Sequence, residues 1–288
     1  MHRDRLHMMT RRHHGFTLIE MVMVIAITGI IAAVVAVFIK FPVQGYLDSA
    51  RRAEMTDIAD TAVRRLTRDL RLAVPNSVRV KVVSGVSYLE FLQTKTGAYY
   101  RAQCSGDPCA ADDILDFTTP DTSFDVLGGF PAAPAPQPQA GDLIVVYNQG
   151  GINADAYAAN NTAVISNVGG SVTTPRLTIG ATRFPFESSS QNFQVIDTPV
   201  TYVCDPGVAG ADGTGTLTRI WGYAITPGQA TPPSGTSAML ASRVSSCVIS
   251  QPENLPLPGY ALVTVRLKLK ASNEEVTFYH EAHVSNVP

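Results

Sequence analysis

The hydrophobic positions of the chain begin with one long apolar run. The run extends from Met21 to Ile39 and is interrupted only by Thr28 and Gly29. It carries no charge, and at about 1.5 Å rise per residue it nearly reaches the ~30 Å hydrocarbon thickness of a bilayer. The pattern therefore predicts a transmembrane helix over about residues 16–41.

A second helical pattern follows the apolar run. Its apolar positions recur at spacings near three and four, with charged residues between them, which is typical of an amphipathic helix. Pro42 lacks an amide donor, so we expect it to kink or loosen the helix, and Pro75-Asn76 ends the pattern. The sequence predicts a spine helix over residues 16–74. The apolar positions of its second half are Leu47, Ala50, Met55, Ile58, Ala62, Leu66 and Leu70.

Residues 75–288 lose the helical periodicity and show short alternating runs, frequent Gly and Pro, and one stiff Pro-rich loop at 131–139. We predict a single β-rich head, and hence an α+β fold in which the spine helix packs on that head. The expected strands are 77–83, 86–93, 142–148, 176–179, 200–203, 217–225, 240–249, 260–270 and 275–284.

Glu20 lies one turn into the apolar segment, with no Lys or Arg in the same turn. A carboxylate in a spanning segment costs roughly 2.5 to 3.5 kcal/mol at the bilayer centre, so it usually marks a function with a partner. The natural partner is a cation from another chain. Four arginines and one acid in residues 1–15 hold that end in the cytoplasm, which predicts an inner-membrane protein with a periplasmic head.

An ordinary secretory signal peptide is the alternative interpretation of this N-terminus. Its apolar core would be shorter and would end at a small-residue cleavage site, whereas this run is long and starts beside an acid. The four leader histidines have no ligand spacing, so we predict no metal there.

After its basic leader, the string Gly15-Phe16-Thr17-Leu18-Ile19-Glu20 resembles the cleavage and methylation motif of type IV pilins and type II secretion pseudopilins. The resemblance implies that a prepilin peptidase cuts between Gly15 and Phe16, and that Phe16 becomes the N-methylated N-terminus. It also implies that Glu20 pairs with the Phe16 amine of a neighbouring subunit during assembly. The implied partners are the peptidase, other pilins through the N-terminal helix, and the assembly platform. A start at Met8 or Met9 would give the shorter leader usual in this family.

Several stretches beyond the N-terminal motif are similar to MshO-like biogenesis proteins of the mannose-sensitive haemagglutinin pilus, and through them to GspJ-like minor pseudopilins. This similarity implies a subunit that initiates or caps a filament. One departure from the pilin pattern is that Val37 stands where many pilins have proline, and Pro42 comes five residues later. The similar stretches are 41–46, 115–117, 123–129, 201–204, 219–223 and 279–288.

Charge and cysteine content fit a secreted head. The full chain has 22 basic and 24 acidic side chains, and the leader removes four arginines and one aspartate, so the remainder carries a net charge of −5. No broad basic patch is indicated, so nucleic acid is not a predicted partner. The four cysteines suggest an oxidising compartment, with candidate disulfides Cys104–Cys109 and Cys204–Cys247. Neither pair has the spacing of a zinc site.

Catalytic motifs are scarce, and we predict no enzyme and no cofactor. No Gly-x-Ser-x-Gly elbow, phosphate loop or His-Glu-x-x-His is present. His280 and His283 lie three apart on an expected strand and should point to opposite faces. The acidic residues at 112–116 and at Asp205 and Asp212 could bind calcium, but solvated turns explain them better. A secretion pseudopilin, a tip adhesin or DNA-binding module, and a membrane-tethered periplasmic enzyme remain alternative functions.

Overall fold

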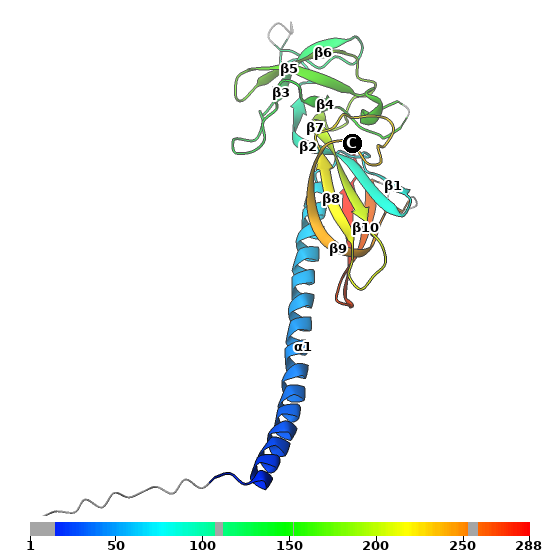
Figure 1. Cartoon of the computed structure of the whole chain (residues 1–288). Coiled ribbons are helices and arrows are strands. Elements are labelled where there is room, and N and C mark those ends of the chain that lie inside the picture. The colour runs from blue at the N-terminus through cyan, green and yellow to red at the C-terminus, as the bar shows by residue number, and fades with distance from the viewer. Residues whose placement is uncertain (1–14, 107–111, 152, 253–258) are drawn as a thin grey trace, which may run out of the picture. The chain divides into compact units, whose positions relative to one another are not determined.

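One long helix precedes all the strands that the structure describes (Figure 1). This computed structural model describes residues 15–106, 112–151, 153–252 and 259–288. Residues 1–14 of the predicted leader and Cys109 therefore lie outside the described residues. The chain divides into two compact units, Met1–Arg51 and Arg52–Pro288. The α+β fold class predicted from the hydrophobic pattern is confirmed.

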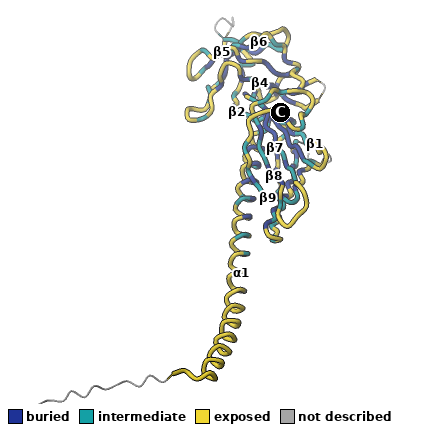
Figure 2. Tube along the Cα trace, in the orientation of Figure 1, coloured by how far each residue is buried: buried dark blue, intermediate teal, exposed yellow. Residues whose placement is uncertain are grey.

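Helix α1 extends from Leu18 to Leu70, which is 53 residues. It starts two residues later and ends four residues earlier than the predicted spine. The helix is continuous through Pro42, because the segment is helical at Pro42 and on both sides of it, and the kink or loosening expected there stays a prediction. Loss of one amide donor removes one hydrogen bond, and the flanking bonds of the helix remain. The described side chains from Leu18 to Leu47 are all exposed (Figure 2).

The second half of α1 buries one face against the strands of its unit. Met55, Leu66 and Leu70 are fully buried there, at the helical spacing that the sequence predicted. These residues share one hydrophobic core with β-strand residues such as Leu89 and Val263. Tertiary packing therefore supports this half of the helix, because a helix seldom stands in water on propensity alone.

In the part of the chain that the structure describes, eleven strands follow α1, and all their pairings are antiparallel. The sheet order is β1-β2-β3-β6-β5-β4-β7-β8-β9-β10-β11, with an additional β2–β7 pairing. The strands are β1 Arg79–Val83, β2 Val86–Tyr100, β3 Asp121–Leu127, β4 Leu143–Val145, β5 Thr162–Gly170, β6 Pro175–Thr182, β7 Asn192–Asp205, β8 Gly215–Trp221, β9 Thr236–Ser250, β10 Tyr260–Ala271 and β11 Glu274–Ser285.

Strands β2 and β7 each contribute residues to two separate hydrophobic cores. The first core lies between α1 and β2, β7, β8, β9, β10 and β11, and the second lies among β2, β3, β4, β5, β6 and β7. The β2–β7 register shifts twice between Leu92 and Thr96. Each of the nine expected strands overlaps an observed one, whereas β3 and β5 were not predicted.

Strand β9 changes its partner midway. It pairs with β8 up to Val244 and with β10 from Val244 onward, and Arg243 just before this point has a positive φ of 60°. This bend brings Cys247 beside Cys204 of β7, with the Cα atoms 5.7 Å apart. The two cysteines form the predicted disulfide.

A buried ion pair joins the last turn of α1 to the sheet. The Asp69 carboxylate, on a residue only 3% exposed, accepts hydrogen bonds from Arg219 Nε at 2.7 Å and from the Tyr202 hydroxyl at 2.9 Å. Arg219 also donates to Gln93 on β2 at 3.0 Å. Burial, together with the neighbouring Asp69 charge, raises the pKa of Tyr202 and keeps its phenol a donor. The network fixes the end of the helix against β2, β7 and β8.

Substitution of Asp69 tests this attachment. Asp69→Ala leaves the Arg219 guanidinium buried without its carboxylate, so we expect the free energy of unfolding to fall by about 3–5 kcal/mol. The exposed Asp57 makes no ion pair with any described residue, and Asp57→Ala should change stability by less than about 0.5 kcal/mol. Urea unfolding of the detergent-solubilised full chain, followed by fluorescence of its one tryptophan, measures both. Equal losses in the two variants would contradict the assignment.

Candidate processing and assembly site

The first turn of α1 is closed by a capping box formed by Thr17 and Glu20. The Thr17 amide and hydroxyl donate to Glu20 Oε2 at 3.0 Å and 2.9 Å, and the Glu20 amide donates back to Thr17 Oγ1 at 3.3 Å. Thr17 stands directly before the first helical residue, so it is the N-cap and Glu20 is the third helical residue. The Thr-x-x-Glu spacing before an apolar run is the sequence signature of such a capping box.

The segment before the helix is open to other molecules. Gly15, Phe16 and Thr17 have no regular secondary structure, and Phe16 is 80% exposed. Nothing lies within 4 Å of the position that a Cβ would occupy at Gly15. The Gly15–Phe16 bond therefore lies in an accessible, non-helical segment that ends directly before α1.

The apolar part of α1 satisfies its own polar groups. Thr28, the only residue with a polar side chain between Met21 and Ile39, donates its hydroxyl to the Val24 carbonyl at 2.7 Å. Helical backbone groups are likewise paired within the segment, as a membrane interior requires. Within the described chain, α1 is the one helix long and apolar enough to cross a membrane, judged by length and composition.

The comparison with known protein families identifies this N-terminal region. The prokaryotic N-terminal methylation motif matches residues 10–36. No curated protein and no solved structure was found to match the chain. The motif indicates a protein of the type IV pilin or pseudopilin type, with a structural rather than a catalytic role, and together with the apolar helix it indicates a membrane anchor. It covers less than a tenth of the chain and does not describe the head.

The structure brings together only some of the predicted site residues. Gly15, Phe16 and Glu20 lie within one short segment at the start of α1, whereas the four cysteines lie in the unit Arg52–Pro288. Cys104 is disulfide-bonded, but its expected partner Cys109 is outside the described residues. Cleavage after Gly15, methylation of Phe16 and the assembly role of Glu20 remain predictions.

The acidic residues after position 111 are not simple solvated turns. Asp112 and Asp113 form ion pairs with Arg101 at 3.4 Å and Arg176 at 3.3 Å, respectively. Both arginines also contact the buried Asp125. Hydrogen bonds from Ser105 hold the pKa of Asp112 below its usual value. Among the described residues, no group of His, Cys, Asp or Glu could hold a metal ion.

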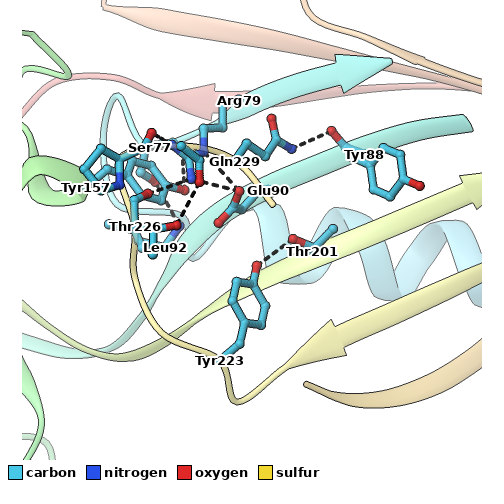
Figure 3. A network of polar contacts seen from close by, with 12 residues as sticks. Ser77, Arg79, Tyr88, Glu90, Leu92, Tyr157, Thr201, Tyr223, Thr226 and Gln229 are labelled. Atoms are coloured by element: carbon cyan, nitrogen blue, oxygen red, sulfur yellow. Dashed lines mark hydrogen bonds and ion pairs between the residues drawn. The ribbon is translucent and has the colours of Figure 1, made fainter. Parts of the chain in front are cut away.

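A second buried ion pair links β1, β2 and the loop after β8 (Figure 3). Arg79 Nε donates to Glu90 Oε2 at 3.0 Å, and its other nitrogens donate to the carbonyls of Thr226 at 3.0 Å and Pro227 at 2.7 Å. The guanidinium lies 3.6 Å from the centre of the Tyr157 ring. These contacts hold the loop after β8 against β1 and β2. We call the Arg79–Glu90 pair, together with the two loop carbonyls that Arg79 binds, the Glu90 clasp.

Two cavities lie on either side of Asp197 and Thr198. One, of about 450 Å³, is lined by Tyr157, Tyr223 and neighbouring residues, and the other, of about 530 Å³, by Lys95, Arg219, Trp221 and their neighbours. The lining residues of both include neither His nor Cys. His280 is half-buried and His283 is exposed, as their predicted opposite faces require.

The Glu90 clasp predicts a definite dependence of stability on pH. Burial raises the pKa of Glu90 above the ordinary 4.5, although Arg79 acts in the opposite direction. A carboxyl group with a raised pKa binds its proton more tightly in the folded state, so its contribution to stability falls as pH rises through that pKa. The unfolding free energy of the natural chain, measured against Glu90→Gln, should fall as pH rises from below 4.5. Urea midpoints across this range measure it, and a difference that grows with pH would contradict the burial argument.

Proposed function

We propose that the chain is a minor pilin or pseudopilin that enters a filament after processing at its N-terminus. In this proposal a prepilin peptidase removes residues 1–15, Phe16 is N-methylated, and the head faces the periplasm until assembly. The observation that carries the proposal is the match to the methylation motif over residues 10–36, at the start of a helix whose residues 21–39 carry no charge.

The proposed mechanism is electrostatic. Cleavage creates an ammonium group at Phe16, and Glu20 supplies a carboxylate one turn into the apolar helix. Water does not screen charges in a low-dielectric interior, so an ammonium of one subunit beside a carboxylate of the next is a strong contact. A subunit in the wrong register would leave both groups unpaired, which is costly. The contact would therefore determine the register of neighbouring subunits.

The capping box provides hydrogen-bond partners for the Glu20 carboxylate before assembly. Its Oε2 accepts two hydrogen bonds from Thr17, so the carboxylate is hydrogen-bonded within its own chain. We propose that this pairing keeps Glu20 at a fixed position in the single subunit. The neighbour's ammonium would then add to the hydrogen bonds from Thr17.

We propose further, from the resemblance of several stretches of the sequence to MshO-like proteins, that the subunit starts or caps a pilus of the mannose-sensitive haemagglutinin type. A minor pseudopilin of a type II secretion system is the alternative within the same class. The two differ in the assembly platform and in the neighbouring subunits. Identification of the proteins that co-purify with the processed chain distinguishes them.

The first test of the proposed function is the N-terminus of the mature protein. Intact-protein mass spectrometry of the chain from its native cells should give a form that begins at N-methylated Phe16. The Gly15→Leu variant should accumulate with its leader attached, because a bulky side chain would then stand directly before the bond that the peptidase cleaves. A chain that keeps its leader in cells with an active prepilin peptidase would contradict the proposal.

The second test separates insertion from assembly. Glu20→Val removes a carboxylate from the apolar segment, so the variant should insert in the membrane and be processed. Its amount in sheared filaments should fall by tenfold or more, which corresponds to a loss of about 1.4 kcal/mol. Thr17→Val keeps the carboxylate and removes the hydroxyl of the cap, so it should assemble better than Glu20→Val. Normal incorporation of Glu20→Val would contradict the electrostatic mechanism.

A further inference from the structure

A cavity of about 440 Å³ lies between the end of α1 and strand β11. Arg64 and Arg68 of the helix and Arg71 directly after it line this cavity, together with Phe278 and His280 of the strand. The three arginines are spaced four and three residues apart, and the Arg71 amide still donates to a helical carbonyl. Residues at this spacing lie on one face of a helix, so one wall of the cavity carries a row of guanidinium groups.

The cavity lies at an edge of the sheet. In the order of the described strands β11 is the last, and it pairs there with β10 alone. Phe278 and His280 belong to the strand face that also carries the buried Ala282 and Val284. Tyr279 belongs to the opposite face and yet lines the cavity, so the cavity reaches around the edge of β11. A molecule from solution can enter at this edge.

The lining residues carry an excess of positive charge. They include three arginines and one acid, Asp60, which leaves two positive charges. Arg64 Nε donates to the Asp60 carboxylate at 2.6 Å, so these two residues neutralise each other. The side chains of Arg68 and Arg71 are exposed and form no ion pair or hydrogen bond with the residues that the structure describes. These two guanidinium groups therefore line the cavity without a counter-charge from the described chain.

The position at a helix end explains only part of this arrangement. The C-terminus of a helix carries about half a negative charge, which favours basic residues in the last turn. That effect requires no cavity, and it does not account for His280. The Nε2 atom of His280 is buried and has no hydrogen-bond partner among the described residues. Buried polar atoms in proteins nearly always have a partner, so this atom indicates that another group belongs in the cavity.

We propose that the cavity binds a phosphate group with two negative charges, either free phosphate or the phosphate of a monoester. The planar fork of arginine matches phosphate oxygens in geometry and stays charged. A carboxylate has one charge on two oxygens, whereas a dianionic phosphate has at least three free oxygens and neutralises both Arg68 and Arg71. This site does not involve the segment around Glu20, and it goes beyond the proposed function.

The size and the apolar part of the cavity leave room for more than the phosphate group. Its volume lies within the range of small-molecule sites, about 300–1,000 Å³. Val63 and Phe278 form an apolar part of the wall. The carbon atoms of a phosphate monoester can pack there while the phosphate group contacts the arginines.

Isothermal titration calorimetry of the detergent-solubilised full chain measures this binding. The probes are inorganic phosphate and glycerol 3-phosphate at about pH 8, where phosphate groups are mostly dianionic, with the ionic strength held constant by sodium chloride. We expect saturable binding of phosphate at one site per chain, and acetate at the same concentration should not compete. Tighter binding of glycerol 3-phosphate assigns the site to esters, and tighter binding of inorganic phosphate assigns it to the free anion. No saturable binding of either probe overturns the proposal.

Single substitutions in the lining identify the site. Arg68→Gln and Arg71→Gln each remove one guanidinium group and break no ion pair with a described residue, so both variants should fold. Each should weaken phosphate binding by about tenfold or more, because each removes charge-assisted hydrogen bonds to the anion. Arg183→Gln is the matched control, because Arg183 is also exposed and does not line this cavity.

The control and the variants together locate the bound anion. If Arg183→Gln weakens binding as much as the other two, the phosphate responds to the net charge of the chain and not to this cavity. If Arg68→Gln and Arg71→Gln both bind phosphate like the natural chain, the anion lies elsewhere. Either result overturns the proposal. Urea midpoints of the three variants should equal that of the natural chain, which separates a loss of binding from a loss of folding.

Discussion

The packing of the second half of α1 against the strands is the contact on which the rest of the structure depends. Met55, Leu66 and Leu70 bury one side of this half, and the Asp69–Arg219 ion pair fixes its last turn. A helix that buries one face must expose the other, so the position of the exposed charged residues on this half follows from the position of the buried residues. The buried pair does not by itself imply high stability, because desolvation offsets much of its attraction. Its geometric effect is to prevent the helix from rotating or sliding on the sheet.

The sequence predicted the elements of the fold better than their arrangement. Helical spacing and alternation located α1 and nine of the strands, because these patterns depend on local periodicity. The polar segment Asp121–Leu127 and the segment Thr162–Gly170 have weak alternation, so β3 and β5 were missed. The sheet order and the change of partner in β9 depend on contacts between residues distant in sequence. A local pattern does not contain that information.

The polar contacts likewise divide into those that the sequence could predict and those that depend on the pairing of distant strands. Ser84-Gly85 forms a two-residue turn with positive φ at both positions, and a two-residue loop sets the register of a hairpin. The pairing of Arg79 with Glu90 could therefore have been predicted from the sequence, as could the capping box of Thr17 and Glu20. In contrast, Arg101 and Arg176 meet Asp125 only because the strands that carry them pair across long separations. The expectation of solvated acidic turns lacked this information.

The surroundings of Glu20 decide how selective the proposed assembly contact is. Glu20 lies in an apolar segment, where a charge pair is strong and an unpaired charge is costly. Exposed ion pairs, such as the one between Asp60 and Arg64, contribute little and are weakened by salt. In the proposed assembly the contact at Glu20 therefore discriminates sharply against wrong registers, and it can form only after cleavage creates the ammonium group at Phe16.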